Sequence, residues 1–484
     1  MPHDDDADHA LIARLWRETG GTDAAHPALG LSGPQDVLPS AFAVTTLATA
    51  SVALATLAAA ELLAARTGTE PRAVQVDRAH AALAFRRELY ASAVGWEMPP
   101  LLDPIAGDYA ARDGWIRLHT NYAHHRDAAL RVLGVAPERS AVAVAVARRD
   151  RDALEQDVVD AGGCAAAMRD RGAWQEHPQG IAVAAEPLLA RSTADVLTGL
   201  ADQEGCNRHG VPSAAPRWRP AAAVRPLDGV RVLDLTRVIA GPICTGFLAG
   251  WGADVLRIDP PGFAEVPALL PETTAGKRRA FVDLRSSAGR ATFEDLLRSA
   301  DVLVAGHRGG ALAALGFGDA ELRARHPALV VATLDAYGWS GPWAGRRGFD
   351  SLVQMSSGIA AHGQEVYGSD RPHPLPAQAL DHATGFLLAA AVCRALTARL
   401  DGAATTVRAS LARTAELLWS LGESDDPRTP PPTADDVAPW LEQVPTHWGP
   451  LRRIRQPGGI AGLAPGLGTE AGPLGWHVPA WRAS

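Results

Sequence analysis

The stretch GVRVLDLTRVIAGPICTGFLAGWGADVLRID, residues 229–259, decides the fold class of this chain. Residues 229–235 form a short apolar run with β-branched side chains, which is typical of a strand buried on both faces. The apolar segment at about 243–251 predicts a helix, and residues 254–259 predict a second strand. A strand, a helix and a strand at this spacing predict a parallel βαβ unit.

The same alternation continues after this unit. Further strands are predicted at 278–284, 301–306 and 328–336, with helices at 287–299 and 319–325. We therefore predict an α/β fold whose large domain is a doubly wound, Rossmann-like parallel sheet. The ligand of such a sheet binds at the carboxyl ends of the strands, so the site residues are expected there.

A second segment of the chain resembles a later part of this domain. Residues 42–83 and 376–417 share one order of features: a long Ala-rich helix, a glycine stop, a strand and a helix. Two interpretations are open, namely two similar helices by chance or a duplication with one degenerate copy. The copies differ at one important place, because the first has Leu47 or Ala48 where the second has Asp381.

These patterns divide the chain. The large domain is expected to be joined to a smaller α+β domain by a Pro-containing linker. The predicted parts are residues 1–90 as a degenerate partial repeat, 91–202 as the small domain, 203–225 as the linker, 226–423 as the large domain and 424–484 as a Pro/Gly-rich extension.

Composition narrows the function classes. The 484 residues carry a net charge of -8, which argues against binding to nucleic-acid phosphates. The four cysteines lack metal-type spacing, so neither a metal site nor a disulfide framework is predicted. The longest apolar run, at about 42–65, is mostly alanine and contains Glu61, which predicts a buried helix rather than a membrane span. With an acidic N-terminus that does not resemble a signal peptide, a cytoplasmic location is expected.

Two carboxylates are candidates for chemistry. Asp381 is predicted to lie just before a long apolar helix, where it serves as an N-cap or as a nucleophile near the positive helix end, and both roles are compatible. At the helix N-terminus its pKa is expected to stay low. Asp350, in a predicted loop, is either a turn residue or a group that positions the substrate or a second carboxylate.

Basic residues and histidines add two further candidate groups. Several basic residues flank strand ends or loops and together suit the phosphates of a coenzyme A: Lys277, Arg278, Arg279, Arg285, Arg308, Arg346 and Arg347. The segment 117–126 holds His119, His124 and His125 without the acidic or cysteine partners of a metal site. A surface or interface cluster is therefore the preferred interpretation of these histidines.

Five segments of the second half resemble one family in order and spacing. They are PLDGVRVLDLTRVIAGPICTGFLAGWGADVLRIDPPG (226–262), GKRRAFVDLRSSAGR (276–290), DVLVAGHRGGALAALGFG (301–318), LVVATLDAYGWSGPWAGRRGFDSLVQMSSG (329–358) and PLPAQALDHATG (374–385). Together they resemble the family III CoA-transferases, the group of the formyl-CoA and carnitine CoA-transferases, to which α-methylacyl-CoA racemases are related. The N-terminal half resembles later parts of the same family, which implies a fused and rearranged member.

The resemblance implies an activity and its residues. Asp381 falls on the family nucleophile, which moves CoA between an acyl-CoA and a small carboxylic acid through an aspartyl anhydride and an aspartyl-CoA thioester. Coenzyme A would be a substrate, with no permanently bound cofactor and no metal. The implied CoA contacts are Ile239, Ala240, Val282, Asp283, Leu284, Arg285, Gly306, His307, Arg308, Arg347, Gly348, Phe349 and Asp350. Family members form interlocked dimers, so a homodimer or an internal pseudo-dimer is expected, with neither nucleic acid nor membrane as a partner.

Departures from the family pattern keep alternatives open. The usual Asn-Phe-Arg-Pro-Gly run is Gly306-His307-Arg308-Gly309-Gly310 here, and no Gly-rich lid follows Asp381. An acyl-CoA racemase or isomerase is one alternative, but it would need a histidine at the position of Phe349, which cannot exchange a proton. A non-catalytic CoA-binding protein is the other.

Overall fold

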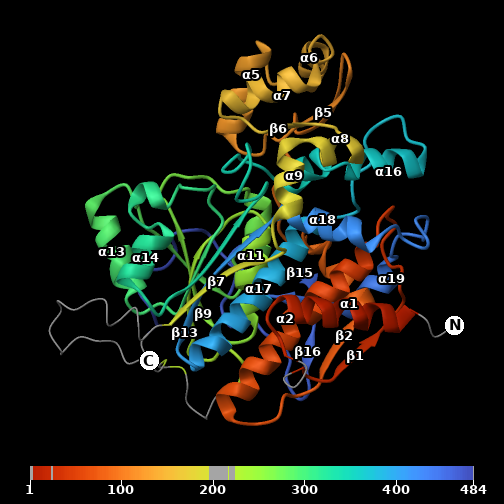
Figure 1. Ribbon diagram of the computed structural model, residues 1–484. Coiled ribbons are helices and arrows are strands. Elements are labelled where there is room, and N and C mark those ends of the chain that lie inside the picture. The colour runs from red at the N-terminus through yellow and green to blue at the C-terminus, as the bar shows by residue number, and fades with distance from the viewer. Residues whose placement is uncertain (1–3, 23–25, 196–215, 217, 219–223, 483–484) are drawn as a thin grey trace.

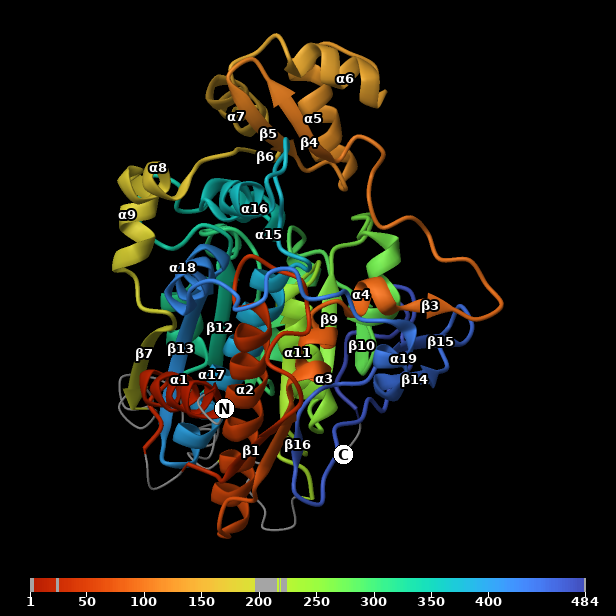
Figure 2. The same cartoon turned by 90° about the vertical axis from the view of Figure 1, so that its right-hand side faces the viewer.

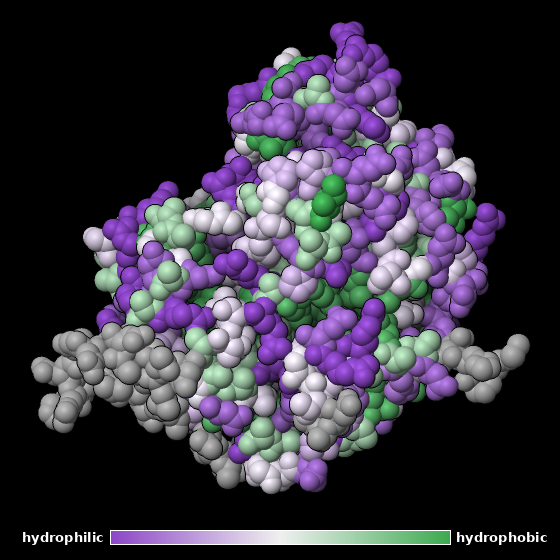
Figure 3. Space-filling view, viewed as in Figure 1, coloured by the Kyte–Doolittle hydropathy of each residue, from purple (hydrophilic) through white to green (hydrophobic). Residues whose placement is uncertain are grey.

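A computed structural model of the chain describes residues 4–22, 26–195, 216, 218 and 224–482. Figure 1 shows a large body built around one sheet, with a smaller lobe that projects from it. The quarter turn of Figure 2 shows the lobe joined to the body through extended segments and the helices α8, α9, α15 and α16. Hydrophilic side chains cover most of the face in Figure 3, and the lobe carries them as well.

Among the described residues, seven strands form the central sheet in the order β10-β9-β8-β11-β12-β13-β7. All neighbours are parallel except β13 and β7, which are antiparallel. The predicted α/β fold with a doubly wound sheet is confirmed. The strands are β8 Arg231–Leu235, β9 Asp254–Asp259, β10 Lys277–Phe281, β11 Val302–Ala305, β12 Val330–Asp335, β13 Ala403–Ser410 and β7 Ala190–Asp195.

Helices cover both faces of this sheet, as a parallel sheet requires. Leu233 and Leu303 pack on one face with Phe293, while Val232 and Val302 join the larger core on the other face. Alternate residues of each strand therefore enter different cores. The helices of this body are α11 Ala240–Gly250, α12 Leu270–Thr273, α13 Ser287–Leu297, α14 Asp319–Arg325, α15 Asp350–Ser356, α16 Ile359–Tyr367, α17 Ala379–Leu400 and α18 Leu411–Leu421.

The strand order reverses between β8 and β11, the first and fourth of the parallel strands along the chain. The chain leaves β8 toward one side of the sheet and β11 toward the other. The loops after these two strands therefore separate and leave a crevice at their carboxyl ends, where ligands of doubly wound sheets bind. The candidate site has to be sought at this point.

The smaller lobe has its own sheet and core. Strands β4, β5 and β6 form an antiparallel sheet, and Ile116, Val142 and Leu154 belong to a hydrophobic cluster within the lobe. Residues 190–195, which the sequence division placed with the small domain, form the edge strand β7 of the main sheet. The elements from the lobe to β7 are β4 Gly107–Ala111, β5 Gly114–Leu118, α5 Ala123–Leu133, α6 Arg139–Val146, α7 Arg151–Asp160, β6 Ala165–Ala167, α8 Arg171–Glu176 and α9 Pro178–Ala185.

The N-terminal and C-terminal segments pack together on the body. Strand β16 of the C-terminal segment pairs with β2, and β15 pairs with β3, so the extension predicted at 424–484 belongs to the folded body. The elements of the two segments are α1 Asp4–Glu18, β1 Leu29–Ser32, α2 Val44–Thr67, β2 Val74–Asp77, α3 Arg78–Ala84, α4 Arg87–Tyr90, β3 Ser92–Ala93, α19 Ala434–Val437, β14 Leu441–Val444, β15 Leu451–Ile454 and β16 Gly459–Ile460.

Helices α2 and α17 lie side by side and form the centre of the larger core (Figure 1). Both are long and apolar enough to span a membrane, but the apolar window of α2 is 100% buried inside the fold and that of α17 is 78% buried. The prediction that the N-terminal apolar run is a buried helix is thus confirmed. The succession α2, β2, α3 also has the same order of elements as α17, β13, α18.

Helix α17 approaches α11 very closely at Gly385. A Cβ atom built on Gly385 would lie 2.5 Å from the carbonyl oxygen of Ala240 and 2.7 Å from Cβ of Ile243. We expect Gly385→Ala to lower the free energy of unfolding by about 1–3 kcal/mol, because the added methyl group overpacks the contact. Denaturant unfolding, followed by circular dichroism, measures this loss.

The matched control is Gly246→Ala on α11, where an added Cβ meets no atom within 4 Å. This substitution should leave stability unchanged or raise it by about 0.5–1 kcal/mol, as alanine usually does in a helix. Equal gains for both variants would contradict the close approach of α17 to α11.

Candidate active site

A cavity of about 340 Å³ opens where the strand order reverses. Its walls come from the loops after β8, β11 and β12, from the segment before α15, and from the first turn of α17. Its lining includes these residues predicted from the sequence: Ala240, Gly306, His307, Arg308, Arg347, Gly348, Phe349 and Asp381. Residues far apart in the chain are therefore brought together at the expected edge of the sheet.

The cavity has cationic side chains that the fold does not use. The guanidinium groups of Arg308 and Arg347 have no hydrogen-bond or ion-pair partner among the described residues, and both line the cavity. Arg237, on the same wall, lies 3.7 Å from the Phe263 ring centroid and 3.7 Å from a carboxylate oxygen of Asp259. Free guanidinium groups of this kind are suited to bind phosphate.

Two other titratable groups of the lining, Asp335 and His307, are mainly uncharged near neutral pH. Burial raises the pKa of Asp335 to about 8, so its carboxyl group is mainly protonated and does not repel an anion. Burial lowers the pKa of His307 to about 4, which leaves its imidazole neutral. The positive charge of the cavity therefore comes from its arginines.

Asp381 is the third residue of α17, and its side chain is almost completely buried at the cavity wall. The prediction that it is the N-cap is wrong, because Gln378 holds that position and no side chain caps the helix. The helix begins two residues before Asp381, at Ala379, so Asp381 lies within its first turn. The carboxylate of Asp381 accepts no hydrogen bond from any described residue.

Asp350 holds the start of α17 in place. One carboxylate oxygen accepts a hydrogen bond from the backbone N–H of Asp381 at 2.9 Å, and the other accepts one from Gln354 at 2.5 Å. Gln354 in turn accepts from the backbone N–H of Leu375 at 2.8 Å. The sequence left several roles open for Asp350. The structure shows one of them, in which Asp350 positions a second residue that bears a carboxylate, namely Asp381.

The expected low pKa of Asp381 is wrong. Burial raises the pKa of Asp381 well above its usual value, and the neighbouring carboxylates of Asp350 and Glu88 raise it further. Burial likewise raises the pKa of Asp350 to about 6. The proximity of other carboxylates was not visible in the sequence, since Glu88 lies in the N-terminal segment and contacts His382 at 3.1 Å.

A second cavity, of about 150 Å³, meets the first at Asp381. The two cavities share Tyr122, Val238, Phe349 and Asp381 in their linings. Val238 has a φ of 64°, the only positive value for a non-glycine residue in the described part of the chain. A β-branched residue in this conformation is strained, and strained residues are concentrated at functional sites.

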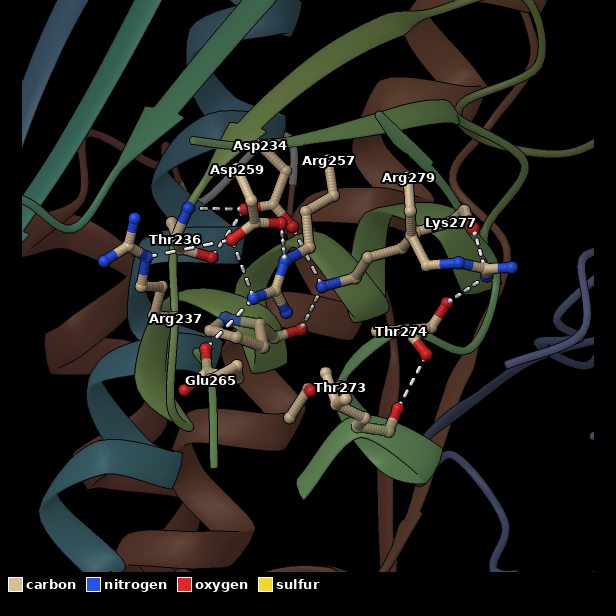
Figure 4. A network of polar contacts seen from close by, with 12 residues as sticks. Asp234, Thr236, Arg237, Arg257, Asp259, Glu265, Thr273, Thr274, Lys277 and Arg279 are labelled. Carbon is tan, nitrogen blue, oxygen red and sulfur yellow. Dashed lines mark hydrogen bonds and ion pairs between the residues drawn. The ribbon is translucent and has the colours of Figure 1, made fainter. Parts of the chain in front are cut away.

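A buried polar network holds this strained loop. Arg257 donates to Asp259 at 2.8 Å and to Glu265 at 3.0 Å, as Figure 4 shows. Glu265 also accepts a hydrogen bond from the backbone N–H of Val238 at 3.4 Å and one from the Tyr122 hydroxyl at 2.5 Å. The network therefore connects the β8–α11 loop with the smaller lobe.

The smaller lobe contributes residues that sequence reasoning did not assign to the site. Tyr122, His124 and His125 line the larger cavity, and His119 stacks on Phe349 with 3.6 Å between the ring centroids. Burial lowers the pKa of His119 and of His125 to about 3, so both are neutral. The histidines thus lie at the interface between the lobe and the body. The sequence feature that could have assigned these residues to the site is the segment 117–126, which places three histidines after a predicted strand.

The remaining predicted residues lie elsewhere. Ile239 lines the smaller cavity, as does Asp350. Residues 282–285 follow β10 outside both linings, and Arg285 pairs with Asp283 at 2.9 Å, so their contact with CoA stays a prediction.

Two of the seven basic residues proposed for phosphate binding serve the fold, and a third, Arg346, forms an ion pair although it also lines the larger cavity. Lys277 is fully buried and donates to Asp234 at 3.0 Å. Arg279 donates to backbone carbonyl groups, two of them at 2.8 Å, and Arg346 pairs with Glu155 at 2.9 Å. The sequence alone does not show which basic residues have partners within the fold and which have none.

Comparison with known proteins gives a consistent result. The family model described as CoA-transferase family III matches residues 227–423. The chain is 31% identical over 278 residues to the probable fatty acyl-CoA transferase Rv3272 of Mycobacterium tuberculosis, covering 49% of this chain and 69% of that protein. This chain belongs to the family III CoA-transferases. The predicted family membership is confirmed, whereas the duplication within the chain stays a prediction.

Two further comparisons match a shorter part of the chain. The succinyl-CoA–D-citramalate CoA-transferase of Chloroflexus aurantiacus is 33% identical over 149 residues, which is 28% of this chain and 37% of that protein. A crystal structure of Rv3272 from M. tuberculosis aligns with a TM-score of 0.38 at 35% identity, over 40% of this chain and 56% of that one. In these two comparisons the chain spans less than two thirds of the other protein's length.

The free arginines of the larger cavity lead to a prediction. We expect Arg308→Ala and Arg347→Ala each to weaken binding of coenzyme A by about 10- to 100-fold, because each removes a charged hydrogen-bond donor to phosphate. Isothermal titration calorimetry with free coenzyme A measures the affinity.

The control is Arg371→Ala, which removes an equal charge from a side chain that is 73% exposed and lies outside the cavity. Its affinity should equal that of the unmodified protein. Equal losses in all three variants would show a general charge effect and contradict specific contacts.

Proposed function

We propose that this family III CoA-transferase moves CoA between an acyl-CoA donor and a carboxylic acid, with Asp381 as the covalent nucleophile. One observation carries the proposal: a buried carboxylate without a hydrogen-bond donor lies where a cavity with free arginines meets a second cavity. A carboxylate that the fold does not use for structure is available for attack.

Coenzyme A would occupy the larger cavity. Its phosphates would bind Arg308 and Arg347, and its thiol end would reach Asp381 at the junction of the two cavities. Coenzyme A enters and leaves as a substrate in this proposal, and no permanently bound cofactor is required. Composition supports a cytoplasmic location, where such thioesters are available.

The reaction would proceed without loss of the thioester energy. The Asp381 carboxylate attacks the donor thioester, the C–S bond breaks, and a mixed anhydride and CoA thiolate result. The thiolate attacks the Asp381 carbonyl carbon, releases the donor acid and forms an aspartyl-CoA thioester. The acceptor carboxylate then displaces the thiolate, which finally attacks the new acyl group and restores the Asp381 carboxylate.

The surroundings of Asp381 suit these steps. Burial keeps water away from the anhydride and the thioester, which water would hydrolyse. The hydrogen bond from its backbone N–H to Asp350 fixes the first turn of α17, so the carboxylate keeps its position through both acyl transfers. Burial near Asp350 and Glu88 also makes the carboxylate a stronger base, and formation of the anhydride removes an unfavourable negative charge.

The nucleophile can be tested directly. Incubation with an acyl-CoA and hydroxylamine should give a hydroxamate on Asp381, detected by peptide mass spectrometry. We expect Asp381→Asn to abolish the hydroxamate and to reduce CoA transfer by more than about a thousandfold, because the covalent route is lost. Coenzyme A affinity should be retained, which controls for folding. A hydroxamate at another residue, or transfer by Asp381→Asn, would refute this role.

The charges around Asp381 predict a pH dependence. Because the pKa of Asp381 is raised, the nucleophile is protonated in acid, and the rate of acyl-enzyme formation should rise with pH through that pKa. Glu88→Gln removes one negative neighbour, while the new side chain still accepts the hydrogen bond of His382. The acid limb of the rate profile should therefore move to lower pH, as rapid quench at each pH measures.

Glu423→Gln is the matched control for this shift. Glu423 also pairs with a histidine, His362 at 3.1 Å, but it lines neither cavity at Asp381. Its profile should coincide with that of the unmodified enzyme. An unshifted profile for Glu88→Gln would show that Glu88 does not act on the nucleophile.

A further inference from the structure

The smaller cavity at Asp381 has a different character from the larger one. Its wall is mainly apolar and includes Leu101, Leu118, Val266, Leu269 and Leu375. Leu118 and Leu269 are almost fully buried, and Val266 is 5% exposed. A thioester placed at Asp381 with its coenzyme A in the larger cavity would therefore direct its acyl group toward hydrocarbon.

The charges that face this cavity already have partners or are negative. Arg117 is the one arginine or lysine among the described residues of its lining, and it donates to Asp108 at 2.7 Å. Glu88 and Asp350 face the same space as carboxylates. A second carboxylate on the acyl group would lose water here and meet negative charge without a free cation, which is costly.

The volume of the cavity sets the size of the acyl group it encloses. About 150 Å³ is the size of an apolar cavity that binds benzene. At the rim, Leu89 is 50% exposed and Leu102 is 56% exposed, so the space is open to solvent on an apolar side. A longer chain therefore has a hydrocarbon-lined exit.

We propose that the carboxylic acid to which this enzyme transfers CoA is an apolar monocarboxylic acid, with about six carbons or fewer of its acyl group inside the cavity, and that dicarboxylic acids are excluded. The inference rests on the proposed function, since it requires acyl transfer at Asp381. The rim residues Leu89 and Leu102 lie in the N-terminal segment, outside the family match at 227–423. Part of the wall that would select the substrate thus comes from residues outside the family match.

The test compares acids of equal length. With acetyl-CoA as the donor, kcat/KM is measured for butyrate against succinate and for hexanoate against adipate. We expect each monocarboxylate to be preferred by about 100-fold or more, because the second carboxylate is desolvated without a counter-ion. Equal or better use of the dicarboxylates would overturn the inference.

A variant that keeps the fold sharpens the test. Leu102→Lys places a cation at the exposed rim and should raise kcat/KM for adipate by about tenfold while lowering that for hexanoate. The matched control is Val94→Lys, since Val94 is also an exposed apolar residue, at 37%, but does not line the cavity. An equal gain in both variants, or no gain with Leu102→Lys, would contradict the assignment.

Hydroxamate formation from acetyl-CoA separates the two proposals. If Asp381 forms no hydroxamate with any donor, the transfer mechanism itself fails and the inference fails with it. If the hydroxamate forms and dicarboxylates are preferred acceptors, transfer stands and only the apolar acyl site is refuted.

Discussion

The arrangement of the site depends on one buried cation, the guanidinium of Arg257 below the carboxyl ends of β8 and β9. It is fully buried between the carboxylates of Asp259 and Glu265, and loss of either partner would leave an uncompensated charge inside the protein. Glu265 also receives the N–H of strained Val238 and the hydroxyl of Tyr122. One ion network therefore fixes the loop, the lobe and the wall that the two cavities share.

Most buried charged side chains of this enzyme have partners within the described part of the fold, whereas a few at the cavity have none there. Buried cations such as Lys277 and Arg279 are saturated by carboxylate or backbone oxygens, whereas Arg308 and Arg347 keep free donors at the cavity. The carboxylates at the site divide in the same way. Asp350 is used to hold α17, and Asp381 is left without a donor, so its charged form is electrostatically costly and its pKa is raised.

The sequence predicted what depends on local pattern. Alternating apolar strands and helices predicted the parallel sheet, whereas the assignment of Asp381 to the site came from the resemblance to the family III CoA-transferases. Strand β7 was not predicted, because ARSTAD at 190–195 has no apolar alternation and is a strand only through its pairing with β13. The raised pKa of Asp381 was missed for a similar reason, since Glu88 reaches it from the other end of the chain.

Helices α2 and α17 pack against each other, but only α17 carries a carboxylate in its first turn. The position that corresponds to Asp381 is Leu47 or Ala48, and both are buried in the hydrophobic core at 1% and 0% exposure. A carboxylate there would be buried without a cavity or a partner, so an apolar residue is the stable choice. Helix α2 supports α17 through packing, and residues that follow it in the chain, including Glu88 and Leu89, line the smaller cavity at Asp381.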